Sequence, residues 1–247
     1  DGLPDREVNR IVEDSLGFIW VGTSDGLARF DGHEWRVFRY QQSDPRSVCG
    51  NTITALAAGH VPGAVWVGTD DGHVCRWAPE REAFVPVPLP DTLADRGRIL
   101  DLLPLSATTI LVSVEKLGLH RLDLSTQRSV AIKANQRQMS NRIFEICLLD
   151  GEVYLGTLSA GLMHLRDGKA HDLSHIRDPF SAPGQTIACI HPAGTNTLWL
   201  GAWDNGLYKH VIGSDTVTQV ATLDHAPFSH TGEEITAITW AHDRLWL

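Results

Sequence analysis

The sequence predicts an all-β fold, a β-propeller of four-stranded antiparallel blades, with about five and a half blades in 247 residues. One aromatic or aliphatic position recurs every 43 to 47 residues, and Gly-Thr or a variant of it follows in most copies: Trp20, Trp66, Leu111, Tyr154, Trp199 and Trp246. A pair of aliphatic residues three positions apart recurs upstream on the same period, from Val8/Ile11 to Ile235/Ile238. A period of about 40–50 residues is typical of propeller blades and of paired-helix repeats.

The pattern inside each repeat favours strands over helices. Short apolar runs alternate with tight turns that contain Gly, Asp or Asn, and no segment keeps the apolar spacing of a packed helix pair. The first repeat therefore predicts four strands, A to D, at Val8–Asp14, Phe18–Thr23, Leu27–Asp31 and Trp35–Tyr40. The predicted blades span 8–52, 53–98, 99–142, 143–186, 187–234 and the partial 235–247. The partial sixth repeat predicts a fragment of a seven-bladed ring.

Residues 11–32, I-V-E-D-S-L-G-F-I-W-V-G-T-S-D-G-L-A-R-F-D-G, resemble the repeat of the two-component regulator propeller family. The resemblance is sharp in the first, second and fifth repeats and weaker in the third and fourth, where Leu111 and Tyr154 replace Trp. It implies the periplasmic sensor region of an inner-membrane receptor, such as a hybrid histidine kinase or a membrane-bound diguanylate cyclase. It implies no particular ligand.

Composition excludes several classes of function. The net charge of −9 argues against a sequence-independent nucleic-acid binder, which needs a basic surface. No apolar run is long enough to span a membrane and no targeting segment precedes Asp1, so we expect no direct membrane contact in this stretch. The histidines show no metal-ligand spacing, so neither a metal nor another cofactor is expected.

The four cysteines, Cys49, Cys75, Cys147 and Cys189, show no C-x-x-C spacing. We interpret them as buried free thiols that pack as small apolar groups. The sequence leaves open whether Cys49 forms a disulfide in an oxidising periplasm, and it indicates no partner cysteine.

The candidate ligand site lies where B–C turns and D–A connections emerge together, because a rigid propeller leaves these loops free to vary. The B–C turns contribute Asp25, Asp71, Lys116, Trp203 and Asp204, and two arginines, Arg98 and Arg142, directly precede the A strands of their blades. We expect an unidentified small molecule there, either a carbohydrate that stacks on Trp203 or an organic anion held by the arginines.

A packing role competes with ligand binding both for Trp203 and for the two arginines. Trp203, whose equivalents we take to be Thr23, Thr69, Val114 and Thr157, is favoured slightly as a cover for a neighbouring blade's turn. For each arginine, pairing between blades with Glu145, Asp101 or Glu7 is favoured over ligand binding.

The predicted function is ligand sensing without catalysis. The sequence lacks a Gly-x-Ser-x-Gly elbow and a phosphate-binding glycine loop, and its carboxylates show no pairing typical of glycosidases. A protein-interaction or homodimerisation scaffold is the alternative, because the fold alone allows it equally. A propeller lyase or glycosidase is less favoured.

Overall fold

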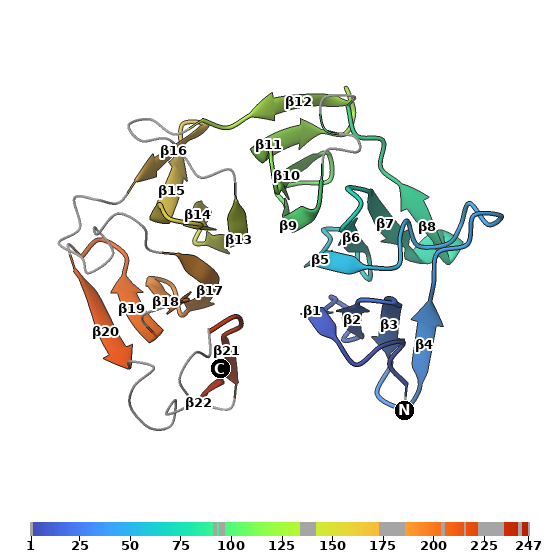
Figure 1. Ribbon diagram of the computed structural model, residues 1–247, viewed down its shortest axis with the longest axis horizontal. Coiled ribbons are helices and arrows are strands. Elements are labelled where there is room, and N and C mark those ends of the chain that lie inside the picture. Colours follow the sequence, from blue (N-terminus) through green and yellow to red (C-terminus); the bar gives the residue numbers. More distant parts are fainter. Residues whose placement is uncertain are drawn as a thin grey trace. The chain divides into compact units, whose positions relative to one another are not determined.

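The computed structural model describes residues 2–90, 93, 97–133, 142–172, 186–203, 206–214, 216–221, 235–241 and 244–246 (Figure 1). The chain forms two compact units, residues 1–131 and 132–247, which are described separately.

The first unit contains three four-stranded sheets (Figure 1). Blade 1 consists of β1 (Val8–Glu13), β2 (Ile19–Thr23), β3 (Gly26–Phe30) and β4 (Trp35–Phe38). Blade 2 consists of β5 (Ile53–Ala58), β6 (Val65–Thr69), β7 (Val74–Ala78) and β8 (Ala83–Pro86), with the 3-10 turn η1 (Pro79–Arg81) between β7 and β8. Blade 3 consists of β9 (Ile99–Pro104), β10 (Thr109–Val114), β11 (Gly118–Asp123) and β12 (Arg128–Ala131).

The second unit contains two further four-stranded sheets and a strand pair. Blade 4 consists of β13 (Ile143–Leu149), β14 (Glu152–Thr157), β15 (Gly161–Arg166) and β16 (Lys169–Asp172). Blade 5 consists of β17 (Ile187–Ala193), β18 (Thr197–Ala202), β19 (Gly206–Val211) and β20 (Val217–Ala221), and β21 (Thr239–Ala241) pairs with β22 (Arg244–Trp246). Each blade is an antiparallel meander in chain order. The predicted all-β propeller of four-stranded blades is confirmed, with five complete blades.

The two periodic sequence markers meet at the contacts between blades. A Cβ built on Gly22 of β2 would lie 2.6 Å from Ile53 Cγ2 of the next blade, and one on Gly68 of β6 would lie 2.6 Å from Ile99 Cγ2. In the second unit, Gly201 meets Ile235 in the same way, at 2.6 Å. No side chain fits at these distances, so the glycine of the Gly-Thr motif lets the aliphatic residue of the next A strand pack directly on the B strand.

The recurring aromatic position of the B strand faces a basic residue of strand C. Trp20 pairs with Arg29, and Trp66 pairs with Arg76. The Arg76 guanidinium carbon lies 5.9 Å from the Trp66 ring centre, a distance at which a cation is attracted to the ring face. The pair of a B-strand aromatic residue and a C-strand arginine therefore recurs as a cross-strand contact in blades 1 and 2.

Candidate functional site

One end of the blades is defined by a repeated backbone hydrogen bond. The residue after each B strand donates its N–H to the carbonyl of the residue before that blade's A strand, with these donor and acceptor pairs: Ser24 to Glu7 at 3.3 Å, Asp70 to Thr52 at 3.1 Å, Glu115 to Arg98 at 2.9 Å, Leu158 to Arg142 at 2.9 Å, and Trp203 to Thr186 at 3.2 Å. B–C turns and the starts of A strands therefore share one end in every blade, which we call the turn end. Arg98 and Arg142 occupy equivalent positions at it.

Within the first unit, the turn end brings two exposed cations together. The hydrogen bond from Glu115 to Arg98 ties the B–C turn of blade 3 to the start of β9, and Lys116 is the next residue of that turn. Lys116 Cδ lies 4.0 Å from the position of a Cβ on Gly97, which adjoins Arg98. Both cationic side chains are exposed, and Arg98 makes no ion pair with any residue that the structure describes. The predicted pairing with Glu145, Asp101 or Glu7 is thus not found for Arg98 among those residues.

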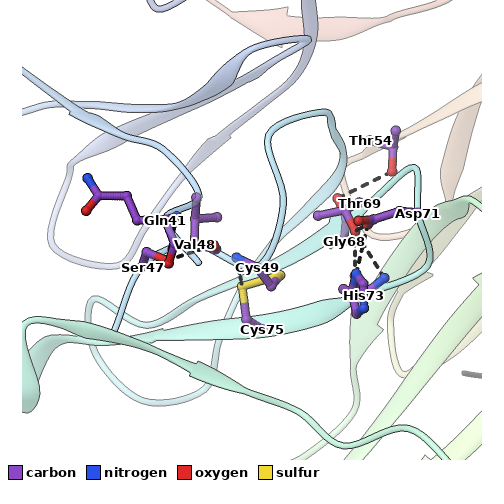
Figure 2. The surroundings of a disulfide bond; sticks show 10 residues. All are labelled: Gln41, Ser47, Val48, Cys49, Thr54, Gly68, Thr69, Asp71, His73 and Cys75. Atoms are coloured by element: carbon purple, nitrogen blue, oxygen red, sulfur yellow. Dashed lines mark hydrogen bonds and ion pairs between the residues drawn. A yellow bond between two sulfur atoms is a disulfide. The ribbon is translucent and has the colours of Figure 1, made fainter. Parts of the chain in front are cut away.

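Asp71 (Figure 2) lies in the adjoining turn of blade 2. In that turn, a Cβ on Gly72 would lie 2.9 Å from the Gly97 carbonyl oxygen. Asp71 Oδ1 accepts hydrogen bonds from the Thr69 hydroxyl and from His73 Nδ1, the latter at 3.0 Å. Partial burial alone raises the pKa of the Asp71 carboxyl, but these hydrogen bonds from Thr69 and His73 outweigh it and hold that pKa below its ordinary value. Asp71 is therefore an anchored carboxylate beside the cations of blade 3.

Asp25, in the turn of blade 1, is an exposed carboxylate with a cation of its own. Arg39 Nη2 lies 3.2 Å from Asp25 Oδ2, and Arg39 Nε also donates to the Asp25 carbonyl at 3.1 Å. The sequence offered no signal for this partner, because Arg39 comes from the far end of the same meander. Asp25 is held by Arg39 and so is the less available of the two turn carboxylates.

Within the second unit, Trp203 is half-buried and Arg142 is exposed. The Trp203 ring lies 5.1 Å from the Phe144 ring of blade 4, between ring centres, as the interpretation of a packing role predicts. The repeat register corrects the equivalents that we assigned to Trp203. Ala202, not Trp203, pairs like Thr23 and Thr157, because the Gly-Ala pair ends β18.

The true equivalents of Trp203 are the donors of the repeated hydrogen bond, Ser24, Asp70, Glu115 and Leu158. Only Trp203 is aromatic among them, so the position still does not require a tryptophan. Asp204 and the adjoining Asn205 lie outside the described residues, as do most of the connections at 134–141, 173–185 and 222–234.

The structure corrects the interpretation of two cysteines. Cys49, in the connection before β5, forms a disulfide with Cys75 of β7, and their Cα atoms are 5.9 Å apart (Figure 2). That separation lies in the usual range for disulfides. Cys147 and Cys189 are buried free thiols, as expected. The prediction failed for the other pair because the approach of the connection to β7 depends on tertiary packing, which spacing in the sequence does not reveal.

The disulfide also positions the turn of Asp71. Gly50 follows Cys49 directly, and a Cβ on Gly50 would lie 3.0 Å from Thr69 Cγ2 and 3.3 Å from Asp71 Oδ1. The Cys49–Cys75 disulfide therefore holds the connection that precedes β5 against the turn that contains Thr69 and Asp71. Sequence reasoning missed Thr69 and His73 as partners of Asp71, although their spacing in the tight turn Thr-Asp-Asp-Gly-His is a usable signal.

The described part of the chain shows neither a cluster of metal-ligating side chains nor a membrane-spanning helix. It contains no group of three or more His, Cys, Asp or Glu side chains placed to hold a metal ion. Three of the histidines, His175, His225 and His230, lie outside it. No helix in it is long and apolar enough to cross a membrane.

The fold and the turn end together define a class, a β-propeller of four-stranded blades with charged loops at one end. Residues 2–25 match the family described as two component regulator propeller. The chain is 44% identical over 48 residues to histidine kinase P4 of Formosa agariphila, a match that covers 19% of this chain and 4% of that protein. The resemblance is confirmed, and the chain carries the two-component regulator propeller repeat.

Solved structures show the same fold. The extracellular domain of the putative hybrid two component system BT3049 from B. thetaiotaomicron matches with a TM-score of 0.73 at 20% identity, over 99% of this chain and 32% of that one. The corresponding domain of BT4673 from the same organism matches with a TM-score of 0.72 at 17% identity, over 96% of this chain and 30% of that one. The chain thus spans about a third of the length of these structures and a small part of the curated kinase.

Proposed function

We propose that this propeller is the ligand-sensing, non-catalytic extracytoplasmic domain of a bacterial signal-transduction receptor. This proposal rests mainly on the match of residues 2–25 to the two-component regulator propeller family. The similar solved structures are themselves described as extracellular domains of hybrid two component systems. A histidine kinase or diguanylate cyclase output belongs to this proposal as a separate part of the receptor.

The disulfide supports an extracytoplasmic location. Disulfides persist in oxidising compartments such as the periplasm and are rare in the reducing cytosol. Cys75 is fully buried and Cys49 is half-buried in the aliphatic and aromatic packing around β5 to β8. A bond within such packing is typical of a structural disulfide.

The ligand that fits the turn end best is an organic anion, an acidic sugar included. Arg98 and Lys116 are two exposed cations, and the hydrogen bond from the Glu115 N–H to the Arg98 carbonyl joins the two segments that carry them. Each side chain offers donors to a carboxylate. Asp71 beside them, held with a lowered pKa, can accept hydrogen bonds from hydroxyl groups of the same ligand. Trp203 and Arg142 in the second unit stay candidates for the same role.

We also propose further blades, up to a closed ring of seven. Val8 and Ile11 of β1 are 42% and 65% exposed, whereas their equivalents Ile53 and Leu56 are 0% and 8% exposed. In blades 2, 3 and 5, the first of these positions packs against the glycine of the preceding B strand, so the face of β1 fits the glycine of another B strand.

The test is a thermal-shift screen of the protein against organic acids, acidic and neutral sugars, and metal ions. A ligand that binds the native state raises the melting temperature by mass action. We expect an acidic compound to give a shift that Arg98→Ala/Lys116→Ala abolishes. The matched control is Arg128→Ala, an exposed arginine at the start of β12 and thus at the opposite end of blade 3.

Two outcomes would count against this assignment. A shift that survives the double variant would move the ligand away from Arg98 and Lys116. No shift with any compound, together with a concentration-dependent dimer in light scattering, would favour the homodimerisation scaffold instead.

A further inference from the structure

The outer contact between blades 1 and 2 is filled by four aromatic side chains. Trp20 and Phe38 of blade 1 meet Trp77 and Phe84 of blade 2, with ring centres 5.0 to 5.7 Å apart. Arg29 is covered in the same cluster, with its guanidinium carbon 4.5 Å from the centre of the Phe18 ring. Large aromatic side chains can therefore fill the contact between two neighbouring blades of this repeat.

The equivalent contact between blades 2 and 3 has lost most of these rings. The strand registers place Trp66 at the position of Trp20, because each pairs with the arginine of strand C. They place Val87 at the position of Phe38, since Val87 donates to Val74 as the fourth strand continues. They place Leu122 and Ser129, which pair with each other, at the positions of Trp77 and Phe84.

A groove of about 260 Å³ opens beside Val87, the residue that stands at the position of the Phe38 ring. Its walls include Trp66, Arg76, Val85 and Val87 of blade 2, and Leu124 and Gln127 of the C–D turn of blade 3. Neither Arg98 nor Lys116 lines this groove, so it is distinct from the site at the turn end. A cavity of about 150 Å³ lined by apolar side chains holds one benzene ring. The groove therefore has room for one or two rings.

Arg76 gives the groove its charge. Its equivalent Arg29 is covered by Phe18, whereas the residue equivalent to Phe18 in blade 2 is the small Ala64. Arg76 keeps only the Trp66 ring, 5.9 Å away, and makes no ion pair with any residue that the structure describes. A guanidinium beside an aromatic wall attracts a second ring by its face and a carboxylate by its N–H groups.

We propose that this groove binds an aromatic carboxylate. Its ring takes the place that the Phe38 ring takes in the neighbouring contact, between Trp66 and Val87, and its carboxylate pairs with the Arg76 guanidinium. The site does not rest on the sensor function proposed above, and it uses neither Arg98 nor Lys116.

The test measures phenylacetate binding to the protein by saturation-transfer NMR and calorimetry. Two probes separate the ring from the charge: benzyl alcohol keeps the ring without the carboxylate, and cyclohexylacetate keeps the carboxylate without the aromatic face. We expect phenylacetate to bind about tenfold more tightly than either probe, since each probe lacks one of the two interactions. Equal binding of phenylacetate and cyclohexylacetate would overturn the assignment of an aromatic ligand.

Two variants place the site. Arg76→Gln should weaken phenylacetate about tenfold and benzyl alcohol much less, because benzyl alcohol has no carboxylate to lose its partner. Val87→Phe restores the ring of the neighbouring contact, so it should abolish binding and raise the melting temperature. Its matched control is Val130→Phe, at a position 65% exposed on β12, which should change neither.

The proposal fails if phenylacetate does not bind at millimolar concentration, or if neither Arg76→Gln nor Val87→Phe weakens it. It also fails if Arg98→Ala/Lys116→Ala abolishes the binding, because phenylacetate would then occupy the turn end. If Val87→Phe does not fold, Arg76→Gln alone decides, since that substitution leaves the packed face of the blade intact.

Discussion

Reduction of the Cys49–Cys75 disulfide should destabilise the first unit substantially. The bond closes a chain segment with a sequence separation of 26 residues. In the chain-entropy account, a loop of that length stabilises the folded state by about 3.5 kcal/mol, because the unfolded chain loses that much conformational freedom. For a protein of this size, each kcal/mol corresponds to roughly 2–4 °C, so we expect the melting temperature to fall by about 7–14 °C.

The assay is thermal unfolding followed by circular dichroism, with and without dithiothreitol. The wild-type protein should lose stability with reductant, and Cys49→Ala/Cys75→Ala should start low and not respond to it. Alkylation of the unfolded, unreduced protein should label two thiols, Cys147 and Cys189, and not four. Labelling of four thiols, or a wild-type melting temperature that ignores the reductant, would refute the reasoning.

Three further predictions follow from contacts inside the units. Gly68→Ala should cost at least about 1–3 kcal/mol in denaturant unfolding, because the new methyl group would lie 2.6 Å from Ile99 Cγ2, and an unchanged midpoint would contradict the role of this glycine. Thr54→Val should cost about 1 kcal/mol, since the buried Thr54 hydroxyl donates to the Ile99 carbonyl of the next blade at 2.6 Å. Thr52→Val should cost less, since the more exposed Thr52 hydroxyl donates to the Ser24 carbonyl at the longer distance of 3.2 Å. Asp71→Asn should lower the free energy of unfolding at neutral pH and match the wild type in acid. Because the pKa of Asp71 is lower in the folded state than in the unfolded state, the ionised carboxylate stabilises the fold fully above the unfolded-state pKa, and this stabilisation is lost as pH falls through the folded-state pKa. Parallel stability curves of the two proteins from pH 7 to pH 2 would disprove it.

The sequence predicted the fold because the repeat records contacts that every blade makes. The glycine of the Gly-Thr motif and the aliphatic residue of the next A strand are two sides of one contact, so both recur with the period of the blade. The Trp of strand B recurs for a similar reason, since it packs on the basic residue of strand C. Features shared by all blades are therefore visible as a period.

The candidate site was predicted less completely, because its features belong to single blades. The disulfide, the Arg39 partner of Asp25 and the hydrogen bonds of His73 each occur once and depend on how a loop folds back. The register of Trp203 was wrong by one residue, because the turn after β18 was aligned by its aromatic ring instead of by the residue that pairs with Gly206. The groove beside Arg76 was missed, since it arises from small residues at positions that hold rings one blade earlier.

The central claim, that the turn end of this propeller binds an organic anion, is tested most directly by calorimetric titration of the acidic compound that gives the largest thermal shift. The account predicts saturable binding that Arg98→Ala/Lys116→Ala weakens by at least about a hundredfold, since two charge-assisted hydrogen bonds of about 1.5–3 kcal/mol each are lost. Arg128→Ala should bind like the wild type. Equal affinity of the wild type and the double variant would contradict the account.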